Sequence, residues 1–168
     1  MRKLLKSSTT ALMLICMTGN VWAATANSVG CANPEDMFAV RVAAVQQRLM
    51  VAALSCHATD SYNKFVISYQ KDLQASDRAL QNFFLRLNDK TGIADYHSFK
   101  TRLANTSSIQ SFRDANYCAN AQTTFDAAFT NARRSLPVFL AGQTTAVDDA
   151  FSPCQQVLTA SANKTPSP

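Results

Sequence analysis

The sequence of 168 residues contains few of the residues that make turns, with only four glycines and five prolines. This scarcity argues against a turn-dense all-β sandwich and against a collagen-like chain. Charged residues make up 16% of the sequence, whereas hydrophobic residues make up 47%. That hydrophobic share suits a globular core and excludes a wholly disordered chain. No uncharged apolar run reaches about 18 residues, so we expect no membrane span in the mature chain.

Residues that commonly carry catalysis are also scarce. Glu35 is the only glutamate, and His57 and His97 are the only histidines. No zinc-protease motif, paired-cysteine motif or nucleophile motif accompanies them, so we predict no catalytic residue, no metal and no cofactor. The alternative is a small cell-envelope hydrolase that uses Glu35 as an acid or His57 and His97 in acid–base chemistry.

The first 23 residues have the pattern of a secretory signal peptide. Arg2, Lys3 and Lys6 precede an apolar stretch over residues 11–17. Val21 and Ala23 then place small residues at the −3 and −1 positions of a cleavage site. This arrangement predicts export to the bacterial periplasm or the cell exterior. We expect cleavage after Ala23, with Ala26 as the second choice.

Removal of that peptide changes the charge balance. The mature chain would keep 13 basic and 11 acidic residues, a net charge of +2 instead of +5. So small a charge, thinly spread, is not typical of a nucleic-acid-binding protein. We therefore expect no nucleic-acid partner.

The four cysteines outside the signal peptide predict two disulfides, because even numbers in exported chains usually pair. Cys31 and Cys56 flank a predicted helix about 30 Å long, which disfavours a bond between them. Two connectivities remain: Cys31–Cys154 with Cys56–Cys118, or Cys31–Cys118 with Cys56–Cys154. We favour the first, because it joins two helices and ties the terminal segments together. Each bond would contribute about 2–4 kcal/mol.

The mature chain reads as helical. Asn33, Pro34 and the acids that follow them predict a helix start, and apolar residues then recur every three or four positions to Cys56. Its polar stripe (Arg41, Arg48 and Ser55) is narrow, which predicts a helix in the middle of a bundle. A second helix is expected from Asp60 or Ser61 to near Asn88, stopped by Gly92 in a left-handed conformation.

Further helices are weaker in the sequence. Asp95 is expected to cap a short third helix that residues 105–108 interrupt, and a fourth helix should run to about Arg134. The apolar residues 136–140 would cover one end of the bundle. Together these features predict an all-α, disulfide-stapled bundle of four to five helices over residues 31–158, and a disordered tail over 159–168.

Parts of the sequence resemble a group of small exported helical proteins of proteobacteria to which no activity is assigned. The likeness lies in residues 49–56, 62–66 and 96–105 and in Tyr117-Cys118, within about residues 38–120. It implies a periplasmic or secreted helical domain with one cysteine on each of two helices, and it transfers no catalytic residue. Cys31 and Cys154 lie outside it.

The function predicted from these features is that of an exported, non-enzymatic bundle that binds an unknown protein partner or associates with the envelope. Besides the hydrolase, a carrier of a small apolar ligand is a further alternative, because eight aromatic residues follow the helical apolar faces. These residues are Phe65, Tyr69, Phe83, Phe84, Phe99, Phe112, Phe125 and Phe129.

Overall fold

The computed structural model describes residues 30–130 and 135–154. The predicted signal peptide, both cleavage sites, residues 155–158 and the predicted tail lie outside the described residues. Within them the chain forms helices α1 (Pro34–Ser55), α2 (Thr59–Ser68), α3 (Gln70–Leu87), α4 (Gly92–Arg113), α5 (Tyr117–Thr130) and α6 (Leu136–Ala141). The all-α, disulfide-stapled bundle is therefore confirmed.

Helix α1 begins where the sequence predicts it. The Asn33 side chain accepts a hydrogen bond from the Asp36 amide at 2.9 Å, and the Asp36 carboxylate accepts one from the Asn33 amide at 2.9 Å. This reciprocal cap satisfies two amides that the first turn would leave unpaired. Asp36 is buried, and its carboxylate also accepts a hydrogen bond from Arg86 of α3 at 2.6 Å.

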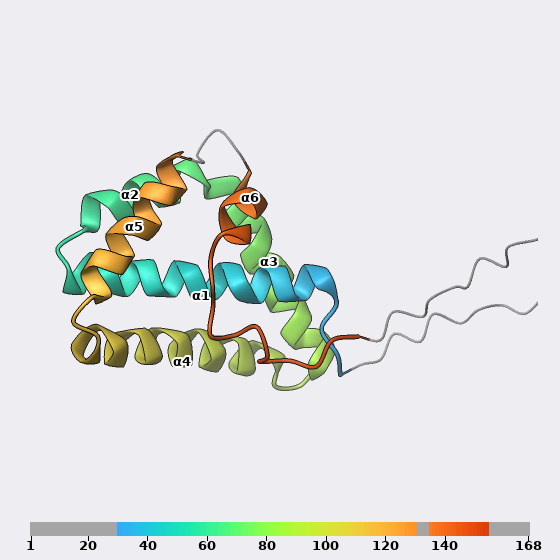
Figure 1. The fold of residues 1–168 in the computed structure, drawn as a ribbon. Helices are drawn as coiled ribbons and strands as arrows, with labels where there is room; N and C mark the ends of the chain where they lie inside the picture. The colour runs from blue at the N-terminus through green and yellow to red at the C-terminus, as the bar shows by residue number, and fades with distance from the viewer. Residues whose placement is uncertain (1–29, 131–134, 155–168) are drawn as a thin grey trace, which may run out of the picture.

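Helix α1 occupies the centre of the bundle and contacts all five other helices (Figure 1). Its length and composition would suit a membrane span, but the other helices bury 56% of its most apolar window. Its nearest neighbour, α4, runs parallel to it, because Val45 and Arg48 share a pocket with Leu103 and Gln110, and Ser55 contacts Ser111. Helices α2 and α3 form the return connection that parallel neighbours need.

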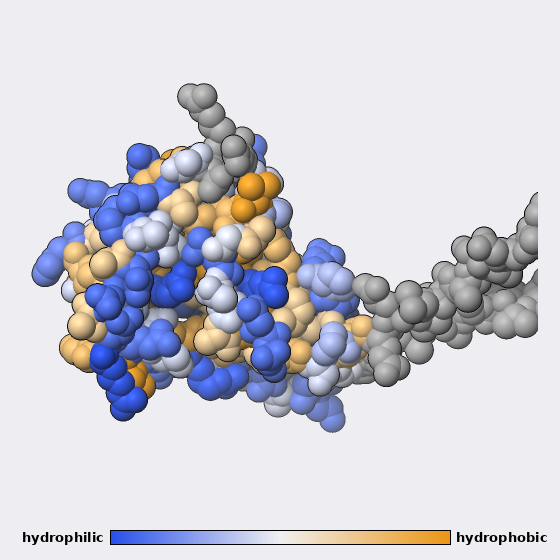
Figure 2. All heavy atoms as spheres, in the orientation of Figure 1, coloured by the Kyte–Doolittle hydropathy of each residue, from blue (hydrophilic) through white to orange (hydrophobic). Residues whose placement is uncertain are grey.

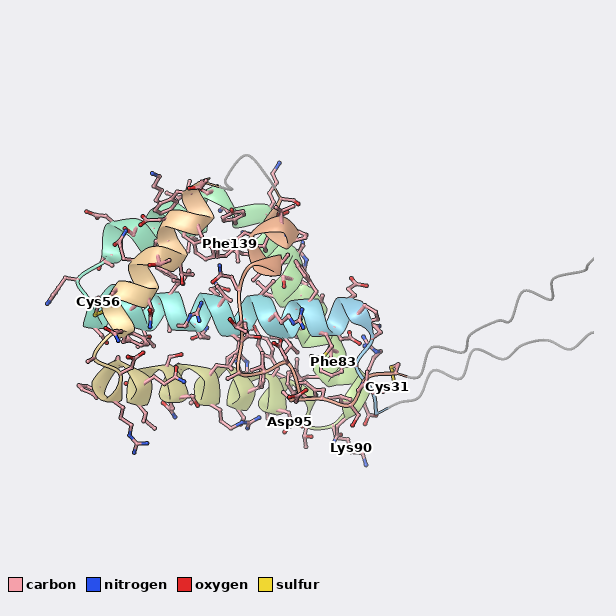
Figure 3. The ribbon with its side chains drawn as sticks, in the orientation of Figure 1. Cys31, Cys56, Phe83, Lys90, Asp95 and Phe139 are labelled. Atoms are coloured by element: carbon pink, nitrogen blue, oxygen red, sulfur yellow. A yellow bond between two sulfur atoms is a disulfide. The ribbon has the colours of Figure 1, made fainter. Side chains whose placement is uncertain are left out.

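Two aromatic clusters make most of the core. One joins α1, α2, α5 and α6 around Phe65 and Phe139, whose ring centroids are 6.0 Å apart. The other joins α1, α3 and α4 around Phe83 and Phe84, which are 5.5 Å apart. Figure 3 labels Phe139 and Phe83 on either side of α1. The apolar residues 136–140 thus form a short helix that covers the first cluster.

The predicted second helix is broken, which the sequence did not indicate. It divides at Tyr69, whose backbone leaves the helical region with φ −117° and ψ 16°. The buried Tyr69 hydroxyl donates a hydrogen bond to the Ala128 carbonyl of α5 at 2.9 Å. Its first half also begins at Thr59 without a side-chain cap, so the predicted capping by Asp60 or Ser61 is wrong.

The predictions for the third helix are wrong in two respects. Asp95 lies in the first turn of α4 and not at its cap, which is Thr91. Residues 105–108 do not interrupt α4, which continues through them to Arg113. Ser107 is buried and lines a pocket together with Val45 of α1. Gly92 does not have a positive φ, so it does not act as a left-handed stop.

A C-terminal strap (residues 142–154) follows α6 and crosses α1 on the face turned to the viewer in Figure 1. The strap returns to the start of α1, where the Ala32 amide donates to the Ser152 carbonyl and the Cys154 amide donates to the Ala32 carbonyl, both at 2.9 Å. Phe151 inserts into the second aromatic cluster, 4.9 Å from Phe83. The strap is therefore part of the packed fold.

Candidate binding site around Arg48

The structure pairs the cysteines in the favoured connectivity. Cys31 bonds to Cys154, with 4.8 Å between their α-carbons, and Cys56 bonds to Cys118, with 5.5 Å. The two bonds lie at opposite ends of α1 (Figure 3). All four cysteines of the described residues are thus in disulfides, which is typical of an oxidising compartment.

The structure gives His57 a role in ending helix α1. This residue follows the end of α1 in the left-handed region, with φ 56°. The next amide, that of Ala58, donates to the Ala53 carbonyl at 3.0 Å, which completes a Schellman ending of the helix. The imidazole is exposed.

The three hydrolase candidates Glu35, His57 and His97 do not come together in the structure. His97 is exposed near the start of α4, whereas His57 lies at the far end of the parallel helix α1, which is about 33 Å long. Glu35 lines a pocket of about 190 Å³ together with Asp72 and Ser76 of α3, and neither histidine lines that pocket. Asp72 is a carboxylate neighbour that the sequence did not reveal, because it lies 37 positions after Glu35 and beyond a helix break.

The polar stripe of α1 proves to be its contact with the later parts of the chain. Arg41 donates to Asp148 of the strap at 2.7 Å, and Ser55 donates to Ser111 of α4 at 3.4 Å. Between them, Arg48 donates from Nη2 to Gln143 of the strap at 3.2 Å and to Thr124 of α5 at 3.4 Å. Stripe residues seven positions apart thus face the strap, α5 and α4.

Among the described residues, Arg48 is the one half-buried cation without a carboxylate partner, because the other cations that lack an ion pair are exposed. The three ion pairs among the described residues are Arg41–Asp148, Arg86–Asp36 and Lys100–Asp77. The Arg48 Nε–H group is buried and donates no hydrogen bond, and Nη2 reaches only neutral oxygens. A half-buried guanidinium without a counter-ion is unusual, because desolvated charges are normally paired.

Burial has the expected electrostatic effects at this place. It lowers the pKa of Arg48, although an arginine stays protonated at neutral pH. Burial also raises the pKa of Tyr117, which the nearby Arg48 charge partly offsets. The Tyr117 hydroxyl donates to the Arg48 carbonyl at 3.1 Å and so fixes the backbone of this turn of α1.

A pocket of about 480 Å³ opens beside Arg48, between α1, α4 and the strap. Its apolar lining includes Val45, Leu103 and Val147, and Val147 is buried. Its other polar lining residues are Thr106, Ser107, Gln110, Thr144 and Thr145. The strap crosses the face shown in Figure 2, where hydrophilic residues gather around the middle. A pocket lined by a single cation and neutral hydroxyl and amide groups is suited to bind an anion.

Sequence reasoning placed Arg48 in the polar stripe but gave it no binding role. The pocket depends on residues from three segments, and the strap that closes it has no strong helical or strand pattern. Protein-family models, curated proteins and solved structures give no match to this chain, so no role is transferred from a relative.

Proposed function

We propose that this chain is an exported, non-enzymatic helical bundle that acts by binding, in the bacterial periplasm or outside the cell. The observation that carries the proposal is the pairing of all four described cysteines in two disulfides, Cys31–Cys154 and Cys56–Cys118. Such bonds persist in oxidising compartments and are rare in the cytosol. The signal-peptide pattern of residues 1–23 supports the same compartment.

The end of the bundle next to Cys56–Cys118 offers a surface for a protein partner. Phe112 of α4 is 87% exposed and Leu54 of α1 is 74% exposed. Their chain neighbours Ser111 and Ser55 are hydrogen-bonded, which brings the two helices together at this point. Exposed aromatic and large aliphatic side chains are enriched at protein interfaces. The partner would be another protein of the cell envelope.

Export is tested by expressing the full chain with a C-terminal tag in a Gram-negative host and fractionating the cells. We expect the protein in the periplasm or medium, beginning at Ala24 or Asn27. Its intact mass should be lower than that of the reduced form by two hydrogens for each disulfide. An unprocessed cytoplasmic protein with free thiols would contradict the proposal.

Partner binding is tested with a photo-crosslinking amino acid at position 112, with Lys71 as a matched exposed position on α3. We expect a discrete adduct with an envelope protein from position 112 and none from position 71. If the adduct forms only at position 71, or at neither position, the partner surface is wrong.

The second candidate function is a small hydrolase of cell-wall glycan, favoured by the shared pocket of Glu35 and Asp72. Two carboxylates that flank a glycosidic bond are the usual machinery of such enzymes. This candidate requires purified protein to release soluble fragments from peptidoglycan, and both Glu35→Gln and Asp72→Asn to abolish the release. The binding function requires no turnover in either the wild type or the variants.

A further inference from the structure

We infer that the pocket beside Arg48 binds a small organic carboxylate that carries a short apolar body. This inference extends the proposed binding function from a protein partner to a small ligand, and it rests on a different part of the molecule.

The charge of Arg48 calls for an anion. Its guanidinium has no carboxylate partner among the described residues, and its buried Nε–H group lacks an acceptor. Asp114 lines a neighbouring pocket of about 260 Å³ with Arg48, but its carboxylate accepts from the Asn116 amide at 2.8 Å and from the Asn120 amide group at 3.4 Å. Asp114 therefore closes the turn between α4 and α5 and makes no ion pair with Arg48, so the position for a counter-charge beside the guanidinium is open to a ligand.

The lining of the pocket distinguishes a carboxylate with an apolar body from a bare inorganic anion. Val45, Leu103 and Val147 offer an apolar surface beside the cation. A planar carboxylate matches the fork of an arginine, and hydroxyls such as those of Thr106 and Thr144 can donate to its second oxygen. Pockets of about 300–1,000 Å³ with few polar groups are typical for small molecules, and this one has about 480 Å³.

The strap makes the pocket dependent on the rest of the fold. Thr145 donates to Asp148 at 2.8 Å, and Arg41 donates to the same carboxylate oxygen at 2.7 Å. Gln143 meets Arg48 directly. The strap thus holds one wall of the pocket in place through contacts within the protein, which reduces the ordering cost of binding.

Calorimetric titration of the oxidised mature protein with hexanoate tests the inference. Hexanamide serves as the neutral analogue and inorganic phosphate as the anion without an apolar body. We expect hexanoate to bind about ten- to a hundredfold more tightly than hexanamide, since a charge-assisted hydrogen bond is lost in the amide. Phosphate should bind more weakly than hexanoate.

The variant Arg48→Met should weaken hexanoate binding by about ten- to a hundredfold. Arg102→Met is the matched control, because Arg102 is an exposed arginine of α4 that does not line the pocket. Thr106→Phe keeps the Arg48 charge but narrows the pocket. If Arg48→Met does not fold, Thr106→Phe tests whether hexanoate binds in this pocket. It should also weaken hexanoate binding.

Equal affinity for hexanoate and hexanamide, or tighter binding of phosphate, would overturn the inference. So would unchanged hexanoate binding in Arg48→Met and Thr106→Phe, or no binding by the wild type at millimolar hexanoate. None of these results would affect export or crosslinking at position 112, so failure here is distinguishable from failure of the proposed function.

Discussion

Gly92 and Phe84 approach so closely that a β-carbon added at Gly92 would lie 2.6 Å from the Phe84 carbonyl oxygen. The same added atom would lie 2.7 Å from the α-carbon of Leu85. Both atoms belong to the backbone, so they cannot move away by a change of rotamer as a side chain could. The end of α3 and the start of α4 can therefore meet only where a residue lacks a side chain.

Gly92→Ala should destabilise the fold by about 1–3 kcal/mol, because the backbone of α3 or α4 must shift to admit the methyl group. Thermal and urea unfolding would measure the loss. Gly142→Ala is the control, since its added β-carbon would meet only the Phe139 carbonyl oxygen at 3.7 Å. A Gly92→Ala protein as stable as the Gly142→Ala protein would contradict the close approach.

His57→Gly should stabilise the protein by about 1 kcal/mol, because glycine adopts the left-handed conformation of this position without strain. The same substitution at His97, which lies within α4, should cost about 1 kcal/mol of helix propensity. Urea unfolding of both variants would reveal the opposite signs. Destabilisation by His57→Gly would imply that the imidazole makes a contact that matters more than the backbone.

Asp77→Asn should lower stability at neutral pH by less than about 1 kcal/mol, since the ion pair with Lys100 is partly exposed. Burial alone would raise the pKa of Asp77, but hydrogen bonds from Lys100 and Tyr96 lower it below its usual range. A lowered folded-state pKa contributes stability above the unfolded pKa of about 3.9, and the contribution fades as pH falls through the folded value.

The difference in unfolding free energy between wild type and Asp77→Asn should therefore be full at pH 7 and shrink towards pH 2. Asp89→Asn, in the exposed turn between α3 and α4, provides the control. A difference that grows with acidity would contradict the assigned direction of the pKa shift.

Replacement of both cysteines of either disulfide by serine should cost about 2–5 kcal/mol. The sequence separations are 123 for Cys31–Cys154 and 62 for Cys56–Cys118, and such a doubling changes the loop entropy by only about 0.6 kcal/mol. The two double variants should thus have similar global stability.

Hydrogen exchange should nevertheless separate the two variants. Loss of Cys31–Cys154 should speed amide exchange in the strap, whereas loss of Cys56–Cys118 should speed it at the start of α5. Faster exchange at the start of α5 in both variants would indicate that the two ends are not independent.

The features that the sequence predicts well are local or strongly periodic. The cap of α1 depends on Asn33 and Asp36, three residues apart, and the structure has it. The length of one helix argued against a bond between Cys31 and Cys56 and left two connectivities, of which the favoured one is present. The central position of α1 followed from its narrow polar stripe.

The features that the sequence misses depend on distant contacts. The apolar rhythm continues through Tyr69, but its hydrogen bond to Ala128 of α5 accompanies a break in the helix. Gly92 resembles a helix stop, yet the nearness of Phe84 is what requires a glycine. Arg48 resembles any solvated residue of the stripe until α4 and the strap enclose it.

The closure of the fold at Cys31 and Cys154 has a mechanical consequence. Tension applied to the chain on the outer sides of these two residues would pass through one covalent bond and bypass the intervening chain, since the two cysteines are 123 positions apart. The helices would then bear no load while the bond is intact. After reduction of this bond, the same pull would act on the strap, starting at the Ala32–Ser152 hydrogen bond and Phe151 and reaching the wall of the Arg48 pocket only afterwards.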